Sequence, residues 1–113
     1  MLVTDSVTDV QIVYVTCPDI ETARLISRDL IENKFAACTN ILCGMESHYV
    51  WDGNYQQDNE VVLLIKTIED QFENIEKRVS ALHPYKLPCV ISFRVAQGSL
   101  NYLKWITDNS KSI

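Results

Sequence analysis

The chain has 113 residues, of which 47% are hydrophobic, and a chain of this size can bury one core without disulfide bonds. We therefore expect a single domain over residues 1–113, with its core at about residues 10–107. The formal charge of −5 comes from mixed acids and bases, and the lack of a basic tract argues against a nucleic-acid partner. No run approaches the roughly 20 consecutive apolar residues that span a bilayer, which argues against a membrane partner.

The compartment is indicated by the N-terminal residues and by the cysteines. Met1–Asp9 lacks the basic start and the long apolar run of a signal peptide, so a cytoplasmic protein is the expectation. The four cysteines are too few and too scattered for a disulfide framework, and we expect free thiols in a reducing compartment. They are Cys17, Cys38, Cys43 and Cys89.

The first elements are a strand and a helix. Val10–Thr16 is rich in β-branched and aromatic residues, which predicts a mostly buried strand. Pro18 then opens a helix, because apolar residues recur at helical spacing from Asp19 to Lys34. A second extended stretch runs over residues 36–51, and Gly44 within it suggests a bulge.

The middle of the chain predicts a hairpin, a helix and a strand. Asp52-Gly53-Asn54 is typical of a tight turn, and the return strand covers Tyr55–Ile65, with only its second half apolar enough for the core. Helical spacing follows over Phe72–Leu82, and His83-Pro84 ends that helix. Val90–Ala96 predicts the fourth strand.

A last helix is predicted over Leu100–Ile106, with Ser99 as its N-cap, and the tail 108–113 is expected to fray. The order of the elements predicts an α+β, ferredoxin-like fold with an antiparallel sheet and its helices on one face. Right-handed crossovers place the first and third strands at the centre, so the second and fourth strands form the edges.

The predicted hairpin is longer than its sheet. Its arms exceed the roughly five or six residues of an ordinary strand, so part of this ribbon should project with Tyr49, Trp51 and Tyr55. Exposed aromatic residues are typical of association surfaces, and an isolated ribbon is marginally stable, so we expect the ribbon to pack between subunits. The alternative is a ribbon that folds back on its own domain.

Three metal-ligand residues should meet at one edge of the sheet. Cys17, Cys89 and His83 converge there, because the first strand ends where the fourth begins and the second helix also finishes at that edge. Two thiolates and an imidazole suit copper or zinc. The alternative is that both cysteines are small buried hydrophobic residues and that His83 caps the end of its helix.

Two further candidates lie on the second strand. Cys38 and Cys43 are an odd number of residues apart, so on a regular strand they face opposite sides, unless a bulge at Gly44 brings them together. Burial is the alternative for both thiols. His48 stands alone on the ribbon, so metal binding there needs a ligand from another subunit.

Charged residues on the return strand suggest either a salt-bridge row or a cleft. Asp58, Glu60 and Lys66 share one face of a regular strand, which favours a solvated or interfacial row of salt bridges. The alternative is a cleft between subunits that holds a small charged ligand, although packing is the favoured role for Trp105. Its candidate residues are Tyr49, Trp51, Asp58, Glu60, Lys66, Tyr85 and Trp105. Neither a catalytic site nor an organic cofactor is predicted, since no nucleophile with its own base and no glycine-rich phosphate loop stands out.

Five short strings agree with one another in order and spacing. They are Phe35-Ala36-Ala37-Cys38, Ser47-His48-Tyr49-Val50-Trp51-Asp52-Gly53, Glu60 to Thr67, His83-Pro84-Tyr85 and Tyr102-Leu103-Lys104-Trp105. Together they resemble the CutA divalent-cation-tolerance family over about Val10 to Ile106. The resemblance implies a ferredoxin-like subunit, a tight homotrimer like the PII signalling proteins, and a role in tolerance of divalent metals, notably copper.

The resemblance also transfers individual residues. The family's histidine before Pro-Tyr falls on His83, and its Ala-Ala-Cys cysteine falls on Cys38. A first-strand metal cysteine of some members aligns with Val15, whereas this chain has Cys17, and Leu82 stands where some members carry a second histidine. Cys89 replaces a glutamate that the family usually has, which would favour a softer metal.

Two functions follow. The first is a trimer that binds copper or a similar divalent ion near His83, with Cys17 and Cys89 as additional ligands. The second is a PII-like trimer without a physiological metal, which binds a small anion or nucleotide through Lys66 or serves as a scaffold for another protein.

Overall fold

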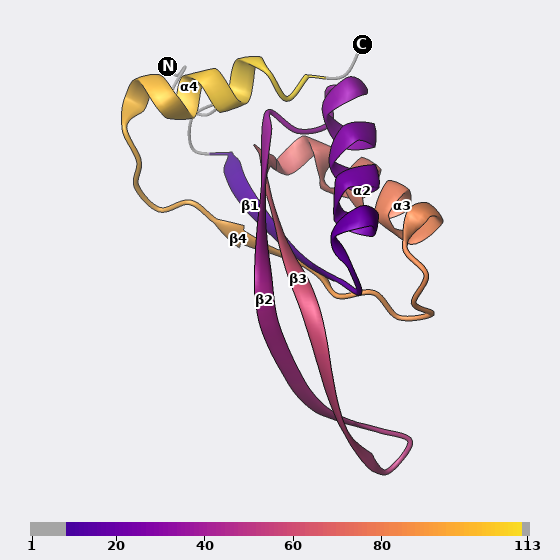
Figure 1. Ribbon diagram of the computed structural model, residues 1–113. Coiled ribbons are helices and arrows are strands. Elements are labelled where there is room, and N and C mark those ends of the chain that lie inside the picture. The colour runs from indigo at the N-terminus through magenta and orange to yellow at the C-terminus, as the bar shows by residue number, and fades with distance from the viewer. Residues whose placement is uncertain (1–8, 112–113) are drawn as a thin grey trace.

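The structure is a computed structural model that describes residues 9–111, and it contains one antiparallel sheet with the strand order β2-β3-β1-β4 (Figure 1). The strands are β1 (Val10–Cys17), β2 (Cys38–Trp51), β3 (Asn54–Ile68) and β4 (Val90–Arg94). The helices are α2 (Ile20–Glu32), α3 (Phe72–Leu82), preceded by the 3-10 turn η1 (Glu69–Gln71), and α4 (Leu100–Asp108). The predicted ferredoxin-like order, with the first and third strands at the centre, is confirmed.

The first helix begins at a side-chain cap. The Asp19 carboxylate accepts a hydrogen bond from the backbone N–H of Thr22 at 2.8 Å, which satisfies a donor that the first turn leaves unpaired. The helix ends at Glu32, earlier than the predicted Lys34, because Lys34 adopts a left-handed backbone conformation with φ 60°. The strand predicted to reach Ala96 likewise ends at Arg94.

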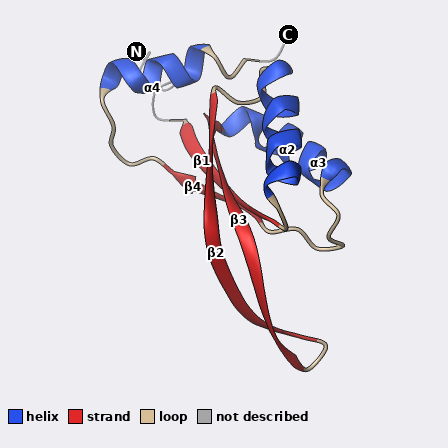
Figure 2. Ribbon diagram, viewed as in Figure 1, coloured by secondary structure: helices blue, strands red, loops and turns tan. Residues whose placement is uncertain are grey.

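The strands have two different faces because successive side chains alternate. On one face, Val13 and Val15 of β1 lie beside Leu63 and Ile65 of β3 and pack against α2 and α3, all without solvent exposure. Figure 2 shows these two helices together on one side of the sheet. An ion pair also joins the two helices, since Arg78 of α3 donates two hydrogen bonds to the carboxylate of Asp29 in α2, at 2.6 and 2.9 Å.

The expectation of all helices on one face is wrong for α4, which, within residues 9–111, covers one end of the other face of the sheet. There α4 packs Leu103 and Ile106 against Val10 and Ile68. Beyond α4, this face remains apolar, and we call it the open face. Its apolar side chains include Ile12, Tyr14, Val62, Leu64, Ile91 and Phe93, the last two being 48% and 55% exposed.

The ribbon formed by β2 and β3 projects from the sheet, as predicted (Figure 1). The register shifts between Leu42 and Met45, and Gly44 has φ 87°, which confirms the expected bulge. Asp52 and Gly53 form the turn with φ 51° and 78°, the geometry that two-residue hairpins favour. The ribbon gives the molecule its long dimension, with extents of 53 × 26 × 22 Å.

The C-terminal segment differs from the expectation in two respects. Ser99 occupies the N-cap position of α4, but its side chain makes no capping hydrogen bond. The expected fraying is wrong for residues 108–110, because Ser110 is fully buried and its carbonyl accepts a hydrogen bond from Gln71 at 3.0 Å. Residues 112–113 lie outside the described residues. None of the helices within residues 9–111 has the length and apolar character that a membrane crossing requires.

The two helix caps predict different mutational effects. Asp19→Ala should lower the midpoint of urea denaturation, whereas Ser99→Ala should leave it nearly unchanged. Of these two N-cap residues, Asp19 makes a capping hydrogen bond with its side chain and Ser99 does not. The capping bond holds the pKa of Asp19 below its ordinary value, so its contribution is present above about pH 4 and is lost as the pH falls through the folded pKa. Equal effects of the two substitutions at pH 7 would contradict this assignment.

Candidate functional site

His83 follows the last residue of α3 and is 6% exposed. Its Nε2 donates a hydrogen bond to the Thr16 carbonyl at 2.7 Å, and its Nδ1 accepts one from the backbone N–H of Tyr85 at 3.2 Å. Both ring nitrogens are therefore engaged, and neither has a lone pair free for a metal ion. The alternative prediction placed His83 as a cap at the end of its helix. His83 does occupy the C-cap position of α3, but its ring is hydrogen-bonded to the Thr16 carbonyl of β1.

The two cysteines of the predicted metal site lie on opposite faces of the sheet. Cys17 is fully buried in the core under the helices, whereas Cys89 and Thr16 line a pocket on the open face. Burial, aided by the nearby charges of Asp19 and Glu60, raises the pKa of Cys17 to about 11, so its thiol keeps its proton. Burial also raises the pKa of Cys89. The predicted edge is formed, but Cys17, Cys89 and His83 cannot share an ion.

The remaining metal candidates are also separated. Cys38 is half-buried and lies opposite Lys66, while Cys43 is exposed beside the bulge. On the ribbon, His48 Nε2 lies 2.8 Å from a carboxylate oxygen of Glu46, and His48 Nδ1 is hydrogen-bonded to the Tyr55 hydroxyl. Within residues 9–111 of one chain, no three histidine, cysteine or acidic side chains are grouped so as to hold a metal ion.

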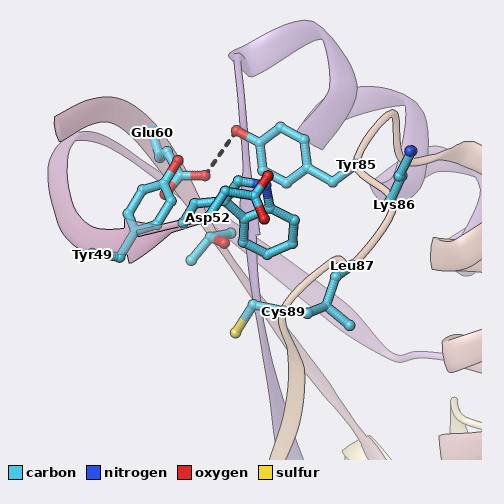
Figure 3. Close-up of a pocket in the computed structure, with 9 residues that line it drawn as sticks. Tyr49, Asp52, Glu60, Tyr85, Lys86, Leu87 and Cys89 are labelled. Atoms are coloured by element: carbon cyan, nitrogen blue, oxygen red, sulfur yellow. Dashed lines mark hydrogen bonds between the residues drawn. The ribbon is translucent and has the colours of Figure 1, made fainter. Parts of the chain in front are cut away.

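A pocket of about 680 Å³ lies at the end of the open face away from α4. Thr16 of β1, Glu60 of β3 and Cys89 just before β4 contribute to it from the open face. The ribbon and the loop over residues 84–89 contribute the other lining residues, among them Tyr49 and Tyr85 (Figure 3). The lining residues are Thr16, Tyr49, Trp51, Asp52, Glu60, Tyr85, Lys86, Leu87 and Cys89.

Two tyrosines donate hydrogen bonds to carboxylates at this pocket. The Tyr85 hydroxyl donates to Glu60 at 3.0 Å, and the Tyr49 hydroxyl donates to Asp58. Glu60 is only 8% exposed. Burial and the bond to Glu60 raise the pKa of Tyr85, and the bond to Asp58 raises that of Tyr49, so both hydroxyls remain neutral donors. These bonds orient both rings toward the acids.

Lys66 and Trp105 lie apart from this pocket, so the predicted set of seven cleft residues is divided. Lys66 Nζ donates to the Tyr102 hydroxyl of α4 at 3.1 Å and sits 5.3 Å from that ring's centroid. Trp105 stacks on Tyr102 with 5.7 Å between ring centroids. Within residues 9–111 of one subunit, no ion pair joins Lys66 to Asp58 or Glu60, so the predicted salt-bridge row does not form inside a subunit.

Sequence reasoning missed four lining residues of the pocket. Thr16 could have been found from strand alternation, since it shares a face with Tyr14. Lys86 and Leu87 lie between two prolines, a signal for a loop with restricted backbone freedom. Asp52 was assigned only to the turn, and no local signal indicates that the ribbon brings its side chain to this pocket.

The bonding of His83 predicts a structural role. His83→Ala leaves the Thr16 carbonyl and the Tyr85 N–H without their partner, so the free energy of unfolding should fall by roughly 1–3 kcal/mol in urea denaturation. Copper affinity measured by calorimetry on the folded variant should not change. The matched control is His48→Ala, an exposed histidine whose loss should hardly affect unfolding. Loss of copper binding in folded His83→Ala would contradict the assignment.

Comparisons with known proteins agree with this fold and with the resemblance noted from the sequence. The family model described as "CutA1 divalent ion tolerance protein" matches residues 11–109. The divalent-cation tolerance protein CutA of Thermus thermophilus is 40% identical over 100 residues, which cover 88% of this chain and 97% of that protein. The human protein CutA is 35% identical over 88% of this chain, but the match spans only 56% of its own length.

Solved structures support the same conclusion. The crystal structure of CutA1 from Oryza sativa has a TM-score of 0.90 and 36% identity, covering 95% of this chain and 98% of that one. The Thermus thermophilus structure has a TM-score of 0.88 and 39% identity, covering 90% and 99%. From the family match and these similarities over most of its length, the chain belongs to the CutA1 divalent ion tolerance family.

Proposed function

We propose that this chain is the subunit of a homotrimer that serves in tolerance of divalent cations, copper among them, by binding the ion rather than by catalysis. The observation that carries the proposal is the open face of the sheet, an apolar surface that the subunit's own helices leave uncovered. The family's description as divalent ion tolerance proteins supports the cellular role.

Assembly is supported by the exposure of the open face and of the edge strand β4. Ile91 and Phe93 are about half exposed on this strand, which has no partner along its outer edge within residues 9–111. Contiguous apolar surface and free strand edges are typical of protein interfaces. Three-fold symmetry is what the family resemblance implies, and closed symmetry would cover the same surface on each subunit.

We further propose that the cation binds between subunits. A single subunit groups no three suitable donors within residues 9–111. The ribbon nevertheless presents the exposed pair His48 and Glu46, whose side chains are 43% and 53% exposed, and a cation there would replace one of the two partners of the imidazole, Glu46 or the Tyr55 hydroxyl. Imidazole nitrogen and carboxylate oxygen are both ligands for divalent transition metals, and a sister subunit would complete the set.

The cytoplasm is the compartment that the thiols favour. All four cysteines are free, and Cys43 is exposed. Exposed thiols persist in a reducing environment, whereas oxidising compartments convert them to disulfides.

The proposed assembly predicts the mass in solution. Light scattering should give three times the 12.9-kDa mass of one chain. The double variant Ile91→Glu, Phe93→Glu should shift the protein to monomers, because charges on the open face cannot be buried between subunits. The matched control is Leu25→Glu, at a 52% exposed position of α2 on the helical side of the sheet, which should keep the wild-type mass. A wild-type monomer at micromolar concentration would overturn the proposal.

The proposed metal site predicts a loss of copper binding on the ribbon. His48→Ala should weaken copper binding in calorimetric titration by about tenfold or more, since second-shell losses alone already reach that range. The dissociated Ile91→Glu, Phe93→Glu variant should lose binding too, because it lacks the sister ligands. The control is Glu73→Ala, an exposed acid of α3, which should bind as the wild type does. Unchanged affinity in His48→Ala would refute this site.

A further inference from the structure

The pocket at the end of the open face carries negative charge that no cation in the described part of the chain neutralises. Glu60 is 8% exposed, and its hydrogen-bond partner is the neutral Tyr85 hydroxyl. The ion pairs formed within residues 9–111 include none of Asp52, Asp58 and Glu60. Lys86 lines the pocket, but Figure 3 shows its ammonium on the far side of the Tyr85 ring from Glu60.

Three aromatic residues line this pocket together with Glu60. Tyr49 and Trp51 belong to the ribbon and Tyr85 to the loop over residues 84–89, so two separate segments contribute the rings. The hydroxyls of the two tyrosines donate to carboxylates, so each ring stands beside an acid. An aromatic ring face attracts a cation through its quadrupole, and the face of tryptophan does so most strongly.

We propose that this pocket binds a small organic ammonium ion, with Glu60 as its counter-charge and the rings of Trp51, Tyr49 and Tyr85 around its alkyl groups. A buried carboxylate is costly without a cation, and a bound ammonium ion would supply one. The volume of about 680 Å³ lies in the range of small-molecule sites. The acids disfavour an anion or a nucleotide at this position.

An organic cation fits the lining better than a metal ion does. The residues described include no group of three donors that could replace the water shell of a metal. Rings and one buried carboxylate instead suit a weakly hydrated cation with apolar substituents. The site uses neither His48 nor Glu46, so it is independent of the metal role proposed for the ribbon.

The test is calorimetry on the purified full chain in its natural assembly, with choline as the probe. Choline should bind, and its neutral carbon isostere, in which a tert-butyl group replaces the trimethylammonium group, should bind about tenfold more weakly or worse. Equal affinity for the two compounds would overturn the proposal. So would the absence of choline binding at about 10 mM, which would mean that a cation of a sister subunit already satisfies Glu60.

Two variants locate the binding. Glu60→Gln keeps the shape and the acceptor for Tyr85 but removes the charge, and Trp51→Leu removes a ring at a 49% exposed position where folding should not depend on it. Each should weaken choline binding by about tenfold or more while circular dichroism stays unchanged. Glu73→Gln, which removes an exposed charge of α3, should bind choline normally. Choline binding that survives both pocket substitutions would overturn the proposal.

Discussion

The two-residue alternation of β1 and β3 is the constraint on which the rest of this structure depends. It places Val13, Val15 and Cys17 on the face that α2 and α3 cover, and Ile12, Tyr14 and Thr16 on the open face. The helical face holds the main core. Because α4 covers only one end of the open face, the remainder is an exposed apolar surface of the kind that protein interfaces use.

The same alternation decides what can gather at the sheet edge. Cys17 and Thr16 are neighbours in sequence, yet their side chains belong to opposite faces, so one is enclosed in the core and the other lines a pocket. Glu60 shares the open face with Thr16, and the loop carrying Tyr85 closes over both. The result is a partly enclosed, acidic and aromatic site, where burial and the hydrogen bond to Glu60 raise the pKa of Tyr85 and keep its hydroxyl neutral.

Local signals were reliable wherever neighbouring residues determine the backbone. The bulge at Gly44 and the turn at Asp52-Gly53 follow from the positive φ angles that glycine and aspartate tolerate. Ser99 shows the limit of such signals, since the residue type marks the cap position but not whether its hydroxyl bonds there. The order at Ser110 was missed because it depends on Gln71, which is 39 residues away in sequence.

The sequence by itself determined the elements, their order, the long ribbon and the family, because hydrophobic periodicity, turn residues and short strings are local properties. Only the tertiary structure decided the roles of the polar residues. It bonded His83 to the Thr16 carbonyl of β1, placed Cys17 and Cys89 on opposite faces of the sheet, and paired the ammonium of Lys66 with Tyr102 of α4 rather than with Glu60. The physical reason is that ligand geometry, burial and hydrogen-bond partners depend on contacts between segments distant in sequence, which periodicity does not specify.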